Sequence, residues 1–180
     1  TERLDSGHYL ERGAVDHSMV LDVADELGLA EYGLTYHRRR VGVGAAFGDG
    51  TTLTFPVDER EVAGALAPTG DVDGYRRLMS TGSALYTLLD GFETPPTLTG
   101  LAAALHRLPG GDDLMRIVVA SADAVLAEHL DDRHLISAVA MYAAHSQVPS
   151  FMPGTGPLAL LLPASHGTAP GRPRGGSAAL

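Results

Sequence analysis

Eight histidines are the side chains of this sequence best suited to bind a metal ion or to move a proton. Glu128, His129 and His134 come nearest to a metal-binding pattern. A zinc-binding helix places two histidines four residues apart, with a glutamate beside the first. Here the two histidines are five residues apart, with the acidic pair Asp131-Asp132 between them. We therefore expect no metal site and interpret both as surface or helix-end histidines.

The glycine-rich run GVGAAFG at residues 42–48 bears a superficial likeness to a dinucleotide-binding loop. Such a loop needs a third glycine where this run has Phe47, and it leads into a helix whose N-terminus receives the pyrophosphate. No helical pattern follows the run, and Gly48-Asp49-Gly50 marks a turn between two strand-like stretches within residues 35–55. The sequence predicts a β-hairpin here and no nucleotide-binding unit.

Nucleophilic catalysis has little support in the sequence. Ser6, Ser146 and Ser165 each lie near a histidine, but the Gly-x-Ser-x-Gly elbow that exposes a nucleophilic serine is absent. The sequence has no cysteine, which excludes a thiolate nucleophile and a disulfide framework. A cytoplasmic location is the expectation, and Thr1 is interpreted as an internal residue of a longer or processed polypeptide.

The run PRGGSA at residues 173–178 places two glycines at the start of a predicted helix. Glycines there let backbone N–H groups approach a ligand closely. Taken by itself, the run favours a tight turn before a helix over a ligand site.

Apolar periodicity and turn residues predict the elements that position these residues. The pattern predicts an α+β fold, in which a mainly helical domain carries a β-hairpin. Residues 1–180 are expected to form a single unit. The helical region covers roughly residues 71–145. The expected helices are residues 16–27, a short helix that begins at residue 57 and ends before Pro68, a longer one from Asp71 through Leu88, and segments at 98–108, 112–128 and 131–145.

Composition limits the class of protein. A hydrophobic content of 44% is too high for a disordered chain, and no apolar run approaches the roughly 20 residues of a membrane span. Thirteen basic against 22 acidic residues give a net charge of −9, which argues against nucleic acid or anionic lipid as a general partner. The cluster at residues 38–40 remains a candidate contact point.

Several motifs, taken in order, resemble the internal segment of phytoene-desaturase-like FAD-dependent oxidoreductases, which are flavoproteins of the amine-oxidase type. They are LDSGH at residues 4–8, FGDGTTL at 47–53, DGYRRL at 73–78, and PGTG at 153–156 followed by PRGGSAAL at 173–180. The family's N-terminal GxGxxG unit, its acidic ribose-binding residue and its C-terminal flavin-binding motif would lie outside residues 1–180. The resemblance therefore implies a substrate-binding segment of an FAD/NAD(P)-binding oxidoreductase fold.

The resemblance also implies a chemistry. FAD would accept a hydride from a C–C or C–N bond of an apolar substrate, and the flavin would carry the reaction. The helices of residues 71–145 would wall an apolar tunnel. No catalytic base is identified, and His8, Tyr9 and Arg174 are the nearest candidates. The residues implied to lie near the flavin are Gly7, His8, Arg174, Gly175 and Gly176.

Two functions stay open at this point. The first is an FAD-dependent dehydrogenase or desaturase, or a truncated or split portion of one, which alone would bind FAD poorly or not at all. The second is a cofactor-free binding module or interaction partner that keeps a lipophilic pocket. We expect a lipophilic small-molecule substrate and a partner chain or N-terminal domain. Exposure of the apolar surface that such a part would cover favours self-association into a homo-oligomer.

Overall fold

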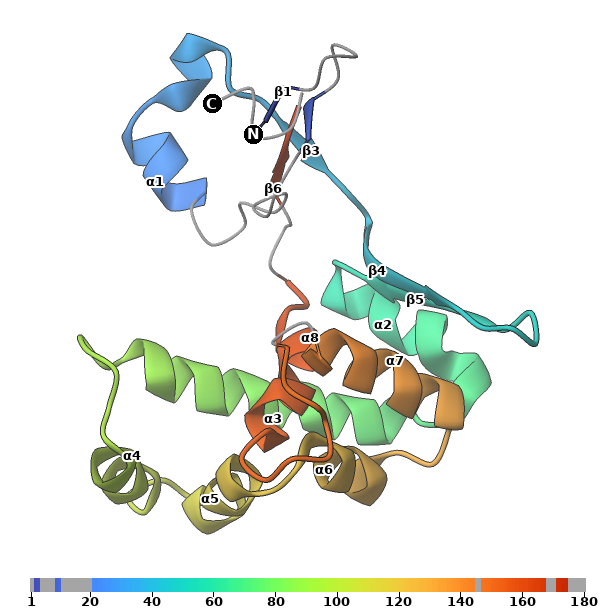
Figure 1. The fold of residues 1–180 in the computed structure, drawn as a ribbon, viewed down its shortest axis with the longest axis vertical. Helices are drawn as coiled ribbons and strands as arrows, with labels where there is room; N and C mark the ends of the chain where they lie inside the picture. Colours follow the sequence, from blue (N-terminus) through green and yellow to red (C-terminus); the bar gives the residue numbers. More distant parts are fainter. Residues whose placement is uncertain (1, 4–8, 11–20, 145–146, 168–170, 175–180) are drawn as a thin grey trace.

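The computed structural model describes residues 2–3, 9–10, 21–144, 147–167 and 171–174. It has an α+β architecture, in which a helical body carries a β-hairpin and lies below a short pair of strands (Figure 1). The strands are β1 (Glu2–Arg3), β2 (Tyr9–Leu10), β3 (Tyr36–Arg38), β4 (Val41–Ala46), β5 (Thr52–Pro56) and β6 (Gly171–Pro173). The α-helices are α1 (Leu21–Glu26), α2 (Glu59–Leu66), α3 (Val72–Asp90), α4 (Leu98–Leu105), α5 (Gly111–Val119), α6 (Ala122–His129), α7 (Arg133–Ala143) and α8 (Leu161–Ala164). Short 3-10 helices are η2 (Leu29–Tyr32), η3 (Ala67–Thr69) and η5 (Gly156–Leu160).

Helix α3 runs through the middle of the body, with α4, α5 and α6 on one side of it and α2, α7 and α8 on the other (Figure 1). Its buried positions recur every three or four residues, as an amphipathic helix requires. They are Gly74, Tyr75, Leu78, Gly82 and Leu85. This face packs against α8, η5 and α6, so α3 organises the core of the body.

The start of α3 is tied to the turn between α6 and α7. The Asp71 carboxylate accepts hydrogen bonds from the backbone N–H groups of Asp131 and Asp132, at 2.8 and 2.6 Å. Gly74 lies where α3 meets the end of α6, and a Cβ atom there would lie against the carbonyl oxygen of His129. Two segments about sixty residues apart in the chain thus meet backbone to backbone.

The predicted hairpin is confirmed as β4 and β5, which pair in antiparallel fashion around a turn at residues 47–51. Leu53 and Phe55 are buried while Thr52 and Thr54 are exposed, so the strand alternates as expected for a half-buried sheet. At the tip, the Asp49 carboxylate lies 2.8 Å from His134 Nε2 on α7. The hairpin is therefore held against α7 at its tip and against α2 along its length.

The hairpin is shorter than the predicted range of residues 35–55. Tyr36–Arg38 forms β3, which pairs with β6 instead, placing Tyr36 opposite Pro173 and Arg38 opposite Gly171. The chain turns at residues 39–40 before β4 begins. We call the β3–β6 pair the neck, because the chain enters the helical body after β3 and returns from it at β6 (Figure 1).

The helix predicted over residues 112–128 is wrong in one respect, because the structure divides it into α5 and α6. Ser121 caps α6, its hydroxyl accepting a hydrogen bond from the Ala124 N–H. The Ala120 carbonyl accepts hydrogen bonds from the N–H groups of Gly154 and Gly156, both at 2.9 Å. A distant loop thus fixes the break.

Thr155 anchors that loop. Its side chain is buried, and its hydroxyl accepts a hydrogen bond from the Ala122 N–H at the start of α6 and lies 2.7 Å from the Met152 carbonyl oxygen. Thr155→Val is expected to lower the free energy of unfolding by about 1.5 kcal/mol, because the buried N–H loses its acceptor. Urea unfolding followed by circular dichroism measures this loss. Thr155→Ser keeps the hydroxyl and should lose less; equal losses would contradict the role of the hydroxyl.

Among the described residues, no helix combines the length and the apolar character needed to cross a membrane.

Candidate functional site

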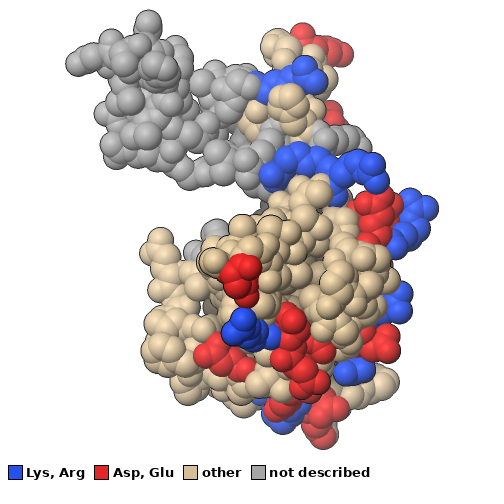
Figure 2. All heavy atoms as spheres, turned by 90° about the vertical axis from the view of Figure 1, so that its right-hand side faces the viewer, with Lys and Arg blue, Asp and Glu red and all other residues tan. Residues whose placement is uncertain are grey.

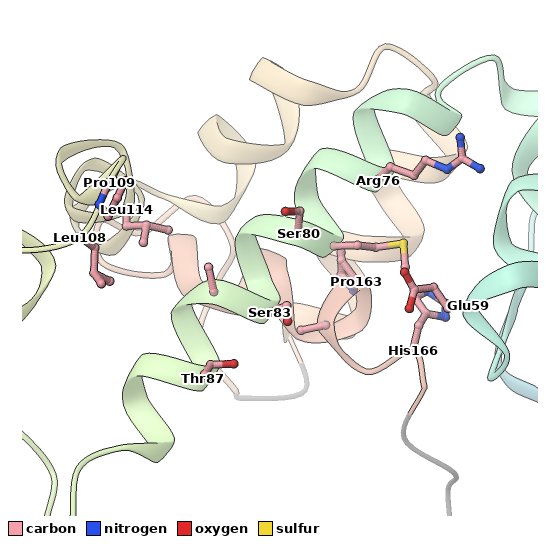
Figure 3. A pocket seen from close by; sticks show the side chains of 13 residues that line it. Glu59, Arg76, Ser80, Ser83, Thr87, Leu108, Pro109, Leu114, Pro163 and His166 are labelled. Atoms are coloured by element: carbon pink, nitrogen blue, oxygen red, sulfur yellow. The ribbon is translucent and has the colours of Figure 1, made fainter.

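An open cleft of about 850 Å³ follows the exposed side of α3, and we call it the α3 groove (Figure 3). Residues of α3 form its floor. The wall facing them comes from the turn between α4 and α5, from the start of α5 and from the end of α8. Helix α5 packs against α4 and η5.

The floor of the α3 groove combines a row of hydroxyl residues on α3 with the apolar side chains of Met79 and Ala84. Ser80, Ser83 and Thr87 recur at intervals of three and four, which places them on one face of the helix. All three are exposed, and Figure 3 shows them along the same helix. The opposite wall is apolar and includes Leu114 and Pro163. The groove is therefore amphipathic in cross-section.

The three hydroxyls have no hydrogen-bond partner among the residues that the structure describes. A hydroxyl in a helix can bond the backbone of its own helix: the hydroxyl of Ser137 on α7 donates to the Arg133 carbonyl oxygen at 2.7 Å. The three hydroxyls on α3 make no such bond to the described chain. Ser80, Ser83 and Thr87 are thus available to bind a ligand.

The other end of the α3 groove carries Glu59, Arg76 and His166 (Figure 3). Within the described part of the chain, Arg76 makes one long ionic contact, 3.8 Å from Asp73, and both side chains are largely exposed. Glu59 and Arg76 bear opposite charges, so this end does not select strongly for an anion or a cation.

His166 is bonded through both ring nitrogens. Its Nδ1 lies 2.6 Å from the Pro56 carbonyl oxygen, and its Nε2 lies 2.9 Å from the Tyr75 hydroxyl. A carbonyl oxygen only accepts, so Nδ1 carries the proton and Nε2 accepts from Tyr75. Burial lowers the pKa of His166, which keeps the ring neutral. His166 therefore joins α3, β5 and the segment after α8, and has no free nitrogen for proton transfer in the groove.

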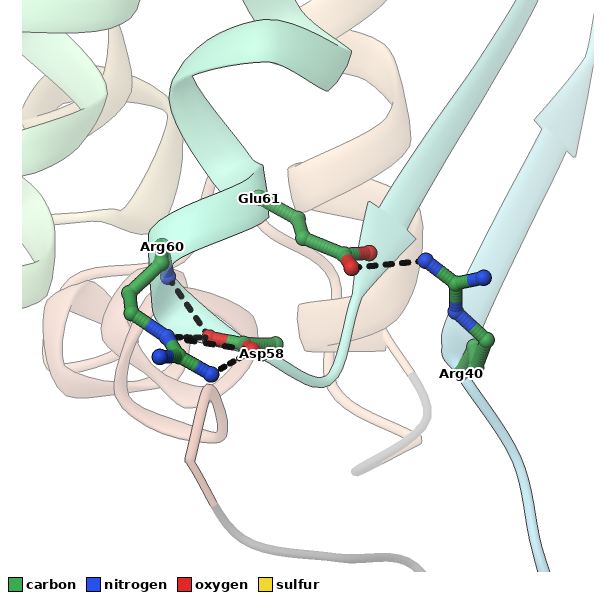
Figure 4. A network of polar contacts seen from close by, with 4 residues as sticks. All are labelled: Arg40, Asp58, Arg60 and Glu61. Atoms are coloured by element: carbon green, nitrogen blue, oxygen red, sulfur yellow. Dashed lines mark hydrogen bonds and ion pairs between the residues drawn. The ribbon is translucent and has the colours of Figure 1, made fainter.

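A second cleft of about 510 Å³ lies beside the start of α2 and includes Arg40 and Arg60. Arg40 pairs with Glu61 at 2.7 Å, and Arg60 pairs with Asp58 at the same distance (Figure 4). Hydrogen bonds from the Arg60 side chain and N–H lower the pKa of Asp58 to about 2. These two guanidinium groups are committed to carboxylates. Figure 2 shows basic and acidic side chains interspersed over this face of the helical body.

The residues predicted to lie near a flavin are only partly described. Gly7, His8, Gly175 and Gly176 lie outside the described residues. Arg174 follows β6 directly; its side chain is exposed, and its backbone N–H donates to the Thr35 carbonyl oxygen at 2.8 Å. Tyr9 lies in β2, opposite Arg3.

The histidines considered for a metal site have separate partners. His129 Nδ1 bonds the Val125 carbonyl oxygen, His134 binds Asp49, and Glu128 pairs with Arg116. Over the described part of the chain, no group of three or more histidine or acidic side chains is arranged to hold a metal ion.

Sequence reasoning missed the α3 groove. The only signal was the three-and-four spacing of Ser80, Ser83 and Thr87, which any exposed polar face of a helix also shows. Nor did the sequence indicate that His166, beside Ser165, contacts a buried tyrosine. The apolar wall comes from three separate segments, and no local pattern predicts that they meet.

No protein-family model matches the chain, and no curated protein gives a significant match to it.

Proposed function

We propose that the chain is the substrate-binding part of an FAD-dependent oxidoreductase, a dehydrogenase or desaturase of an apolar substrate similar to the phytoene-desaturase-like flavoenzymes. The observation that carries the proposal is the neck. Its strand β6 leads directly into Arg174 and the glycine pair at residues 175–176. When a substrate-binding region is inserted into a cofactor-binding fold, the chain must leave that fold and return to it, and two paired strands hold the points of exit and return together.

The residues that follow the neck in the sequence, together with Gly7, suit a flavin nucleotide. The Arg174 guanidinium is exposed and has no ion-pair partner among the described residues, and a guanidinium binds phosphate oxygens well. The glycines at positions 7, 175 and 176 would let the backbone approach the cofactor closely. When bound, FAD would supply the hydride acceptor. The helical body would hold the substrate and exclude water.

Absorbance spectroscopy tests the proposal on the natural gene product that contains this chain. The purified protein is expected to retain flavin absorbance at about 450 nm after removal of free FAD. Arg174→Ala should weaken FAD binding by about tenfold, because a charge-assisted hydrogen bond is lost. Arg107→Ala removes an exposed arginine from the helical body and should leave binding unchanged. A colourless product that takes up no FAD would overturn the proposal.

The α3 groove favours a second candidate function, a cofactor-free binding module. Every residue that lines the groove belongs to the helical body or to the segment just after α8, so the cleft does not need a flavin to be complete. If the purified protein binds a lipophilic ligand but does not bind FAD, this second function is supported and the first is excluded.

A further inference from the structure

We infer that the α3 groove binds a neutral, largely apolar ligand that carries oxygen functions along one edge, in preference to a pure hydrocarbon. The inference rests on the proposed function only in taking this ligand as the substrate of the enzyme. Binding itself requires no flavin.

The oxygen functions are inferred from the row of hydroxyls on α3. Ser80, Ser83 and Thr87 span seven residues, which is about 10 Å along a helix. Each hydroxyl can donate one hydrogen bond and accept two. Since none is bonded to a described residue, the row can receive hydroxyl or carbonyl oxygens from a ligand of at least that length.

The apolar skeleton is inferred from the opposite wall. Leu108 and Pro109 come from the turn between α4 and α5, Leu114 from α5, and Pro163 and Ala164 from α8. These side chains offer no hydrogen-bonding group. A ligand that lies between the two walls therefore gains most by presenting hydrocarbon to one and oxygen to the other.

The preference over a hydrocarbon follows from desolvation. Water bonds the exposed hydroxyls in the empty groove, and a hydrocarbon would displace that water without replacing its hydrogen bonds. Leaving a covered hydroxyl unpaired weakens binding by at least about fivefold. An oxygenated ligand avoids this loss. Glu59 and Arg76 at one end of the lining bear opposite charges, so the lining carries no excess charge that would favour an ionic ligand.

Farnesol and farnesene are suitable probes, because they differ mainly in one hydroxyl on the same type of skeleton. Equilibrium dialysis of the 180-residue chain against each probe gives both dissociation constants. In the variant Ser80→Ala/Ser83→Ala/Thr87→Val, farnesol binding is expected to weaken by about tenfold, whereas farnesene binding stays equal or becomes tighter. Ser137→Ala, which removes a hydroxyl from an exposed position on α7, should change neither.

The outcomes separate this inference from the proposed function. Failure of the wild-type chain to bind farnesol, or an equal change for both probes in the triple variant, would overturn the inference. Ser83→Ala alone provides the same comparison should the triple variant fold poorly. Farnesol binding that responds as expected in a protein that takes up no FAD would overturn the proposed function and leave the inference standing.

Discussion

Gly74→Ala is expected to lower the free energy of unfolding by about 3 kcal/mol, the largest effect among the single substitutions considered. The new Cβ atom would collide with the carbonyl oxygen of His129, a backbone atom at the end of α6. Because Asp71 holds the following turn through two backbone hydrogen bonds, the end of α6 has little freedom to move away. Chemical unfolding followed by far-ultraviolet circular dichroism measures the loss.

Gly64→Ala is the matched control for this substitution. Gly64 is an exposed position inside α2, and a Cβ atom there would have no neighbour within 4 Å. Alanine should stabilise that helix by up to about 1 kcal/mol through its higher helix propensity. The two glycine-to-alanine changes are therefore expected to have opposite signs. A neutral or stabilising Gly74→Ala would show that α3 and α6 do not meet as closely as described.

The sequence predicted the elements whose signals are local. The turn at Gly48-Asp49-Gly50 and the start of α2 at Asp58 are set by residues within a few positions of each other. It did not predict the division between α5 and α6, because the apolar pattern continues across Ala120-Ser121. Hydrogen bonds from Gly154 and Gly156 impose that break from more than thirty residues away.

The candidate site was less predictable than the fold. Tyr75 and Pro56, the partners of His166, lie 91 and 110 residues away in sequence, so residues 165–167 gave no sign of them. The neck pairs residues 36–38 with 171–173, and the strand pattern of residues 35–46 runs on without showing that its first part has a distant partner. The flavin contacts implied by the resemblance stay a prediction, since Gly7, His8 and the glycine pair lie outside the described residues.

His166→Gln is expected to lower the free energy of unfolding at pH 7.5 by about 2 kcal/mol, because the amide lacks the ring geometry that lets His166 bond the Tyr75 hydroxyl and the Pro56 carbonyl oxygen together. The imidazole also bonds the Pro56 carbonyl oxygen, and the neighbouring Gly167 N–H donates to the Val57 carbonyl oxygen at 2.8 Å. The substitution should therefore loosen the segment that returns from α8 toward β6. Hydrogen exchange at the Gly167 amide would report this loosening directly.

The same histidine gives the wild-type protein a pH-dependent stability. Burial lowers the pKa of His166 in the folded state. Histidines of the unfolded chain titrate at about pH 6.5, so as the pH decreases the unfolded chain binds a proton before the folded chain does. Stability is full above that pH and falls as the pH decreases through it. One proton limits the slope to about 1.4 kcal/mol per pH unit, and partial exposure of the ring reduces it.

Unfolding measured from pH 7.5 to 5 should show a smaller slope for His166→Gln than for the wild type, because glutamine does not titrate. His106→Gln is the control, since His106 is 84% exposed and its ion-pair partner among the described residues, Asp112, lies 3.7 Å away. Tyr75→Phe should flatten the profile in part, because the ring then loses the hydroxyl that stabilises its neutral form. Equal slopes for wild type and His166→Gln would assign the acid sensitivity to other groups and contradict the role given to this contact.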